Sequence, residues 1–297
     1  MRRRPIAGLL MAAPPVLLVA LFVGFPIGTA IAYSLGHVGG LNATIALIAR
    51  DQHTVDAWWQ QSVGAYADVL ADDRFRRDLL TTVGVTLVTT VVVVGLAWVV
   101  ALYLRLSGSR AARVLAALAV VPMFIPVVIA SWAILTFYAG DGFVRSLAAT
   151  LGGDAPTLGY TVVCITIAMI WTQLPFATLM IVSGVQAVPG PLIEAAADAG
   201  ASLPRIVRSV LLPLAMVPTV IAATFTAIGT LGAFTVPYFT GPNAPTMLGV
   251  DMAAYFQSYN LPQQAVVVAV VVFLIAAGIG ALYVWANLRA ARDAGRV

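Results

Sequence analysis

The sequence predicts an all-α integral membrane protein with six transmembrane helices. Hydrophobic residues make up 61% of the 297 residues and charged residues only 9%, whereas a soluble domain has roughly 45–50% apolar and about 25% charged residues. The mean hydropathy is +0.97. The apolar segments are continuous and do not alternate, which favours helices over a transmembrane β-barrel. We expect a single membrane domain over residues 1–297.

Six apolar runs are long enough to cross a bilayer, which takes roughly 20 helical residues. The first run follows three Arg residues in the manner of a signal peptide. It is about twice as long as the roughly 7–15-residue apolar region of such a peptide, so we expect an uncleaved helix. The six predicted spans contain no Asp, Glu, Lys, Arg or His and cover about 6–34, 79–104, 114–139, 159–187, 209–238 and 263–288.

The arginines predict that both termini face the cytoplasm. In that orientation 11 of the 16 basic residues lie inside and five outside, and the acidic residues show the opposite bias. This is the distribution that the positive-inside rule requires. The exception is the external segment 72–78, where neighbouring Asp residues nearly neutralise three Arg residues. The sequence pI of about 9.5 therefore follows from membrane topology and does not indicate nucleic acid.

The cytoplasmic loop at 189–208 carries the strongest local pattern. Glu194 is the only glutamate in the chain, and we expect it in the first turn of a short helix, where its charge suits the helix dipole. Gly200 fits the left-handed position that ends a helix.

A second short helix is expected after Gly200. Ser202 can cap it, and Pro204 is tolerated in its first turn. Arg205 and Arg208 would share one face. The residues alone leave two interpretations open, a capped connector lying on the lipid headgroups and a docking element for a cytosolic partner.

This loop resembles the signature of permease subunits of binding-protein-dependent ABC importers, E-A-A-x-x-x-G followed after nine residues by an aliphatic residue and x-L-P. Val210 stands at the aliphatic position, where Ile is commoner. The resemblance implies a type I ABC importer permease fold with cytoplasmic coupling helices between helices 4 and 5. It carries an ATPase-coupling role to Glu194, Ala195, Ala196, Asp198, Gly200, Ala201, Ser202, Arg205 and Pro213.

The resemblance also implies the partners of the chain. These are two ATP-binding subunits, a second paralogous permease and an extracytoplasmic solute-binding protein, in a bacterial cytoplasmic (inner) membrane. The chain itself is then not an enzyme and binds no cofactor, and ATP and Mg²⁺ belong to the partner ATPase. The chain contains no Lys, so it cannot form the ATP-binding P-loop, which needs one.

Two details of the resemblance bear on the solute. Asp198 stands two positions before Gly200, as in polyamine, oxyanion and ferric-iron permeases, whereas sugar permeases usually carry the acid directly before the glycine. The segments Leu231–Pro237 and Met247–Gly249 are similar to those of spermidine/putrescine-type permeases. We therefore expect a small polar solute of the polyamine, oxyanion or iron type, with a carbohydrate importer as the alternative.

The polar and aromatic residues within the spans are candidates for the translocation pathway. They are Ser131, Trp132, Gln173, Thr224, Thr230 and Phe234. Such residues commonly bond or pack between membrane helices, and Gln173 is the best candidate because Pro175 nearby frees a backbone carbonyl.

Other classes of function find less support in the sequence. A proton-coupled secondary transporter generally needs an ionisable relay at membrane depth, which the predicted spans lack. A membrane enzyme would need a catalytic constellation, but the only histidines are His37 and His53 and both lie in a predicted external loop. No metal site is expected, and the single cysteine, Cys164, is expected to be a buried, inert thiol.

Overall fold

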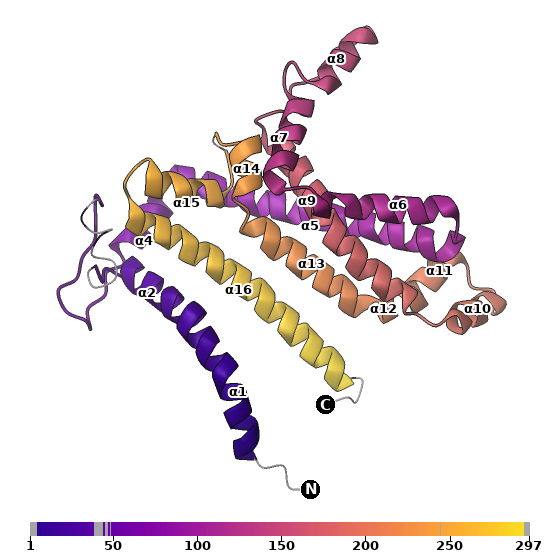
Figure 1. Ribbon diagram of the computed structural model, residues 1–297, viewed down its shortest axis with the longest axis horizontal. Helices are drawn as coiled ribbons and strands as arrows, with labels where there is room; N and C mark the ends of the chain where they lie inside the picture. The colour runs from indigo at the N-terminus through magenta and orange to yellow at the C-terminus, as the bar shows by residue number, and fades with distance from the viewer. Residues whose placement is uncertain (1–4, 39–43, 45–46, 48, 244, 294–297) are drawn as a thin grey trace. The chain divides into compact units, whose positions relative to one another are not determined.

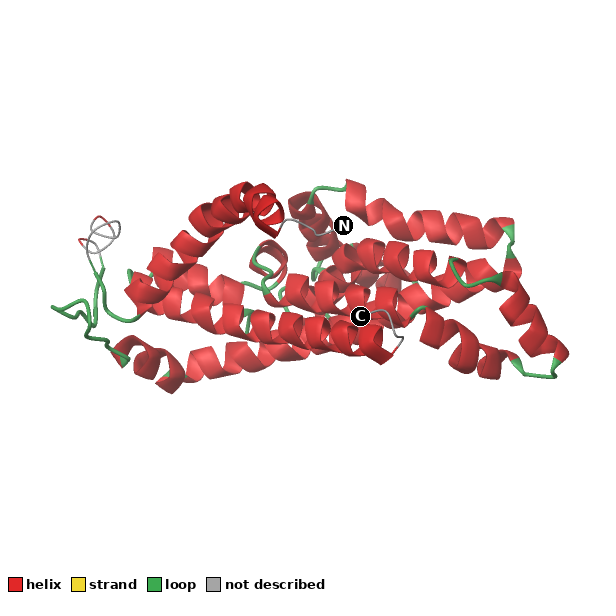
Figure 2. Ribbon diagram, turned by 90° about the horizontal axis from the view of Figure 1, so that it is seen from below, coloured by secondary structure: helices red, strands yellow, loops and turns green. Residues whose placement is uncertain are grey.

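The computed structural model describes residues 5–38, 44, 47, 49–243 and 245–293. Figure 2 shows helices joined by loops, with no strand among these residues. They divide into two compact units. The first holds the described residues up to Arg76 together with Asp251–Phe273, and the second holds Arg77–Val250 and the described residues from Leu274 onward. Arg2, Arg3, Arg4 and Arg296, which count in the orientation prediction, lie outside the described residues.

The first unit begins with one continuous apolar helix. It consists of α1 (Pro5–Val19), a π-helical turn (Ala20–Gly24) and α2 (Phe25–Ser34) (Figure 1). Pro26 lies just after the wide turn. Because proline lacks a backbone donor, a local shift in the hydrogen-bond register lets the helix pass this position. The unit also holds α4 (Gly64–Ala71), the first turn of α5 (Asp73–Ser107), most of α15 (Leu248–Gln257) and the start of α16 (Pro262–Asp293).

Gln263 joins three segments of the first unit. Its buried side-chain Nε2 donates hydrogen bonds to the carbonyls of Tyr33 (3.2 Å) and His53 (3.1 Å). Its Oε1 accepts a hydrogen bond from the backbone N–H of His53 at 2.8 Å. One amide therefore links the end of α2, the segment around His53 and the start of α16. Its removal would leave buried backbone groups without hydrogen-bond partners.

The second unit is organised around α9 (Val162–Gln186), which contacts α6, α7, α13 and α14. These neighbours are α6 (Arg110–Val120), α7 (Val127–Tyr138), α13 (Met216–Leu231) and α14 (Thr235–Thr240). A core of small and medium side chains from α5, α9 and α13 includes Val93, Ala177 and Ala222. Gly184 is needed in this packing because a Cβ there would lie 2.2 Å from Cγ of Pro218. Such small residues let membrane helices approach closely.

Within the part of the chain that the structure describes, five helices are long and apolar enough to cross a membrane, or six if one bent pair counts as a span. Four of them match predicted spans. The helix Met11–Ser34 matches the run at 6–34, and Asp73–Ser107 matches the run at 79–104. The helix Val162–Gln186 matches the run at 159–187, and Pro262–Arg289 matches the run at 263–288. Hydropathy therefore located the uninterrupted helices well.

The predicted span at 114–139 is wrong as a continuous helix. α6 and a 3₁₀ turn (Val121–Phe124) end before Pro126, and α7 begins at Val127 in a different direction (Figure 1). Ile125 is extended, with φ −99° and ψ 125°, because a residue before proline is pushed out of the helical region. The apolar segment long enough to cross is instead Val127–Thr150, which includes α7 and α8 (Phe143–Thr150).

The predicted span at 209–238 is also interrupted. The helices Leu203–Leu214 and Met216–Leu231 form the bent pair and meet at an angle of 74°. α13 then ends at Leu231, and α14 follows as a separate short helix. Prolines at 213, 218 and 237 lie in this segment, and a window average of hydropathy does not register the backbone donors that they remove.

Candidate functional site

The first helix of the loop at 189–208 is α10 (Gly190–Asp198). It begins directly after Pro189, so Glu194 lies in its second turn. The prediction that Glu194 lies in the first turn is therefore wrong. The side chains of Glu194 and Asp198 are exposed, and among the described residues neither carboxylate has a hydrogen bond or an ion pair. Ala195 and Ala196 follow Glu194 and give this helix a narrow surface. α10 therefore presents acceptors and small side chains to its surroundings.

Gly200 ends α10 in the predicted left-handed conformation, with φ +79°. Its N–H donates to the carbonyl of Ala197 at 2.9 Å, and the N–H of Ala201 donates to the carbonyl of Ala196 at 3.0 Å. This pair of bonds defines a Schellman turn, which satisfies the last carbonyls of a helix. The role of Gly200 as the turn between two helices is confirmed.

The second loop helix is only one turn long. α11 (Leu203–Ile206) continues through a π-helical turn (Val207–Leu211) into α12 (Leu212–Leu214), which contains Pro213. Ser202 occupies the N-cap position, but its hydroxyl makes no capping bond. Its carbonyl instead accepts hydrogen bonds from the N–H groups of Arg205 and Ile206. The position predicted for Ser202 is therefore correct, whereas the predicted side-chain bond is absent.

This second segment has one buried and one exposed side. Ile206 and Leu211 are buried, while Arg205 and Arg208 are exposed. Figure 1 places α10 and α11 at the end of the second unit where α5 turns into α6. There Arg105, in the last turn of α5, donates from Nη2 to the carbonyl of Val188 at 2.7 Å. The start of the loop is therefore tied to the end of α5.

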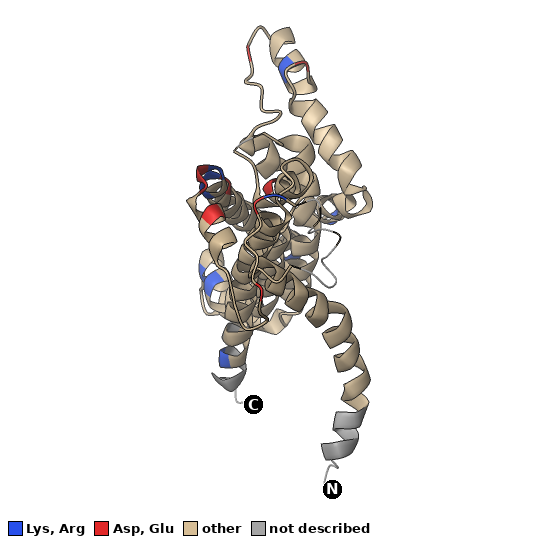
Figure 3. Cartoon of the chain, turned by 90° about the vertical axis from the view of Figure 1, so that its left-hand side faces the viewer, with Lys and Arg blue, Asp and Glu red and all other residues tan. Residues whose placement is uncertain are grey.

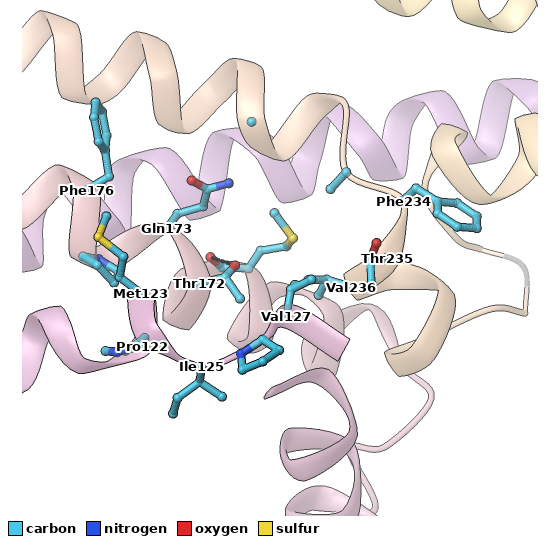
Figure 4. Close-up of a pocket in the computed structure, with 15 residues that line it drawn as sticks. Pro122, Met123, Ile125, Val127, Thr172, Gln173, Phe176, Phe234, Thr235 and Val236 are labelled. Carbon is cyan, nitrogen blue, oxygen red and sulfur yellow. Dashed lines mark hydrogen bonds between the residues drawn. The ribbon is translucent and has the colours of Figure 1, made fainter. Parts of the chain in front are cut away.

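A cavity of about 560 Å³ lies between the helices of the second unit. Figure 4 shows the side chains of Gln173, Thr172, Phe176 and Phe234 around it. Its walls come from the segment Pro122–Val127, from α9, from the end of α13 and from the start of α14. None of its 15 lining residues is charged. The amide of Gln173 has no hydrogen bond within the described part of the chain, so it can pair with a bound solute.

Two of the six predicted pathway residues, Gln173 and Phe234, line this cavity. The other four do not. Ser131 is buried, and its hydroxyl bonds to the carbonyl of Val127 on its own helix at 2.7 Å. Thr224 and Thr230 are buried in α13, and Trp132 is 60% exposed on α7. The sequence pattern did not give the side of the helix on which each polar side chain lies.

Sequence reasoning missed several lining residues. The hydroxyls of Thr172 and Thr235, the thioether of Met123 and the ring of Phe176 all border the cavity. The break between Pro122 and Pro126 opens one wall, so this pair of prolines was the available signal. Pro175 also lines the cavity, in agreement with the reason for selecting Gln173.

The charges of the described residues lie toward the ends of the long helices, on short helices and in loops (Figure 3). The long helices between them are uncharged for most of their length, as segments in contact with lipid must be. This pattern, together with the helices long enough to cross a membrane, defines a class of protein, a polytopic membrane protein.

The family follows from comparison with known proteins. Residues 93–292 match the family model described as "Binding-protein-dependent transport system inner membrane component". The match covers more than half of the chain, and the chain belongs to this family. It is therefore a multi-pass inner-membrane permease subunit of an ABC importer.

Relatives of known description support the same family. The trehalose transport system permease protein SugA of Mycobacterium tuberculosis is 27% identical over 275 residues, which cover 88% of this chain and 82% of SugA. The trehalose/maltose transport system permease protein MalF of Thermococcus litoralis is 30% identical over 207 residues, which cover 66% of this chain and 68% of MalF.

A solved structure supports the fold. A chain of a bacterial ABC transporter involved in import of the acidic polysaccharide alginate superposes with a TM-score of 0.70, covering 97% of this chain and 96% of that one. At 14% sequence identity this likeness bears on the fold alone. The all-helical importer permease fold is thus confirmed, whereas the relatives described here are sugar permeases and not of the expected spermidine/putrescine type.

Proposed function

We propose that this chain forms half of the translocation pathway of an ATP-driven importer for a carbohydrate. The uncharged cavity around Gln173 is the observation that carries the solute class. An amide both donates and accepts hydrogen bonds, as does the hydroxyl of Thr235. The hydroxyl of Thr172 donates to the carbonyl of Met169 and can still accept, so these groups match the hydroxyl groups of a sugar. The apolar ring faces of Phe176 and Phe234 complete a site that suits a neutral polyhydroxyl solute.

A polyamine fits this cavity less well. Bringing a multiply charged cation to membrane depth without a carboxylate partner carries a large desolvation cost, and no acid lines the cavity. The polyamine expectation depended partly on Asp198. That residue is exposed on α10, and α10 contributes nothing to the cavity lining, so its spacing from Gly200 cannot select the solute by contact.

We further propose that α10 and α11 are the coupling helices. Glu194 and Asp198 would accept hydrogen bonds from the ATPase subunit, while Ala195 and Ala196 permit close approach. Gly200, Ala201 and Ser202 would set the angle between the helices, and Arg205 would contact the partner from the second segment. Pro213 would define how that segment joins α13.

The proposed assembly contains this chain, a second paralogous permease, two ATP-binding subunits and an extracytoplasmic binding protein. ATP and Mg²⁺ would bind the ATPase subunits, and this chain would have no enzymatic activity. Both termini would face the cytoplasm, because that orientation places most arginines and the loop at 189–208 on the inner side.

Uptake by proteoliposomes tests the solute class. The importer complex is reconstituted with ATP inside and its binding protein outside, and radiolabelled trehalose, maltose and spermidine are compared. We expect ATP-dependent accumulation of a sugar and none of spermidine. Spermidine accumulation with no sugar uptake would reject the carbohydrate assignment and favour the polyamine type. A thermal-shift screen of the binding protein against sugars and polyamines gives an independent measurement.

A further inference from the structure

The start of α15 touches the wall of the cavity around Gln173. A Cβ added at Gly249 would lie 2.4 Å from the carbonyl oxygen of Ala233 and 3.3 Å from the Cα of Phe234. Ala233 and Phe234 both line the cavity, whereas Gly249 does not. The turn between α13 and α14 therefore borders the cavity and, at the same residues, rests against α15.

Close approach of two backbone segments requires a glycine at position 249. Gly249 belongs to an α-helix and has no left-handed φ, so its backbone conformation suits other residues as well. Real Cβ atoms essentially never come within 3.0 Å of another heavy atom, so an alanine would require a shift of at least 0.6 Å from the present 2.4 Å. A carbonyl group cannot rotate away as the end of a long side chain can. One of the two backbone segments must therefore move.

The start of α15 is the more firmly held of the two segments. The backbone N–H of Leu248 donates to Oγ1 of Thr82 at 2.9 Å, and the N–H of Thr246 donates to Oδ1 of Asp78 at 2.9 Å. The hydroxyl of Thr82 in turn donates to the carbonyl of Asp78 at 2.6 Å. All four residues are fully buried. Displacing α15 would leave buried backbone donors without acceptors, which is costly.

The turn between α13 and α14 is the segment that can move. Gly232 and Phe234 are exposed and Ala233 is half-buried, and the N–H of Ala233 bonds locally, to the carbonyl of Thr230 at 3.1 Å. Figure 4 shows the ring of Phe234 beside the cavity. Because open space borders this turn, crowding at Gly249 would be relieved by moving Ala233 and Phe234 toward the cavity.

We propose that Gly249 is a positioning residue of the translocation pathway. Its lack of a side chain lets α15 support the turn at Ala233, and this support sets where the ring of Phe234 borders the cavity. The role rests on the proposed function, because the solute must enter this cavity for the ring to affect uptake. The segments Leu231–Pro237 and Met247–Gly249, which the sequence analysis associated with the solute, meet at this contact, so packing gives a reason for both.

The first test measures uptake of radiolabelled trehalose by the reconstituted importer. Gly249→Ala should raise the apparent KM about two- to tenfold, as for loss of one favourable contact with an aromatic ring, and should change the maximal rate less than the KM. In a Phe234→Ala background the same substitution should have a smaller effect on KM, because the ring through which Gly249 acts is then missing. Equal effects in the two backgrounds would overturn the proposal.

Gly241→Ala is the matched control. A Cβ there would lie 2.7 Å from Cδ1 of Ile165, so this substitution also crowds the packing of the second unit. Neither Gly241 nor Ile165 lines the cavity, and the KM should stay at the wild-type value. An equal rise in KM for both variants would show that general loss of packing is the cause, and the positioning role would be rejected.

A measurement without solute separates this proposal from the carbohydrate assignment. Fluorophenylalanine is incorporated at position 234 of the detergent-purified full-length chain, and its fluorine NMR resonance reports the surroundings of that ring. Gly249→Ala should shift the resonance, whereas Gly241→Ala should not. An unshifted resonance in Gly249→Ala would overturn the positioning role even where sugar uptake is found. A shift in the absence of any sugar uptake would support the positioning role and reject the carbohydrate assignment alone.

Thr82→Val tests the same contact without crowding and replaces Gly249→Ala if that variant does not fold. Valine has nearly the shape of threonine, but it removes the acceptor for the N–H of Leu248 and so loosens the start of α15. The fluorine resonance at position 234 should again shift or broaden. A resonance identical to that of the wild type would show that α15 does not position the ring.

Discussion

Replacing Gly200 with alanine tests whether the turn between α10 and α11 has the geometry described. Gly200 has φ +79°, and an added Cβ would meet no atom within 4 Å. The substitution therefore introduces no clash. Its only direct effect is to place an L-residue in the left-handed region.

That conformational change costs roughly 1–2 kcal/mol for a residue with a Cβ. The same free energy corresponds to a factor of about 5–30 in the population of the open turn. The N–H of Ala201 reports this opening, because it donates to the carbonyl of Ala196 at 3.0 Å across the turn. We expect its hydrogen exchange to accelerate by about 5- to 30-fold in Gly200→Ala.

The assay is hydrogen–deuterium exchange of the detergent-purified protein, read on peptides that cover α10 and the turn. Gly200→Asn is the matched variant, since Asn adopts the left-handed conformation more readily, and it should change exchange less than alanine does. Equal exchange in the wild type and in Gly200→Ala would refute the assigned turn. Uptake per ATP hydrolysed, measured on the same variants, should fall more with alanine than with asparagine.

Three further substitutions test the loop, the cavity and the first unit. Glu194→Ala should change the free energy of unfolding by less than about 0.5 kcal/mol, because the side chain is exposed, yet it should uncouple ATP hydrolysis from uptake in proteoliposomes. Gly229→Ala would place a Cβ 2.9 Å from Nε2 of Gln173. The displaced amide should raise the apparent KM for sugar uptake several-fold without reducing the amount of folded protein. Gln263→Leu should lower the thermal stability, because each buried group left unpaired costs about 1–3 kcal/mol and this amide makes three bonds to the backbone.

Each of these substitutions has a control. Asp141→Ala removes another exposed acid, outside the loop, and should leave coupling intact; equal uncoupling by both variants would contradict the assignment of Glu194. Gly232→Ala adds a Cβ at an ordinary 3.6 Å from the nearest atom, the carbonyl oxygen of Ile228, so an equal KM change would argue against the role of Gln173. Gln257→Leu replaces an exposed amide, and equal loss of stability would show that the bonds of Gln263 are not the cause.

The sequence predicted the features that depend on local chemistry. Composition and run length located the four uninterrupted helices, because a helix in lipid needs a long apolar segment. Gly200 was predicted as a left-handed turn because few other residues adopt that conformation without strain. The assignment of the loop as a coupling element also depends on a short-range pattern, Glu194 and its spacing to Gly200, and it stays a prediction.

The features that were missed depend on long-range packing or on backbone breaks within apolar sequence. Pro126 ends a helix in a run that remains hydrophobic throughout, so hydropathy alone could not detect it. Ser131 and Gln173 are both polar residues within spans, yet Ser131 bonds within its own helix while Gln173 borders the cavity. The expected solute was less well supported for a related reason. Asp198 identifies the loop but does not border the cavity that the solute would enter.

The bend before α13 limits how far that helix can reach. α13 has 16 residues, which rise about 24 Å, whereas the hydrocarbon layer is about 30 Å thick. Segments beyond its ends must complete any crossing, and the regular helix is interrupted there at Ala215 and at Gly232–Phe234. Irregular backbone persists at membrane depth only against protein or beside water. Ala215 is buried, whereas Ala233 and Phe234 line the cavity. The short α13 thus ends beside the cavity, where water can reach a backbone turn that lipid would not accommodate.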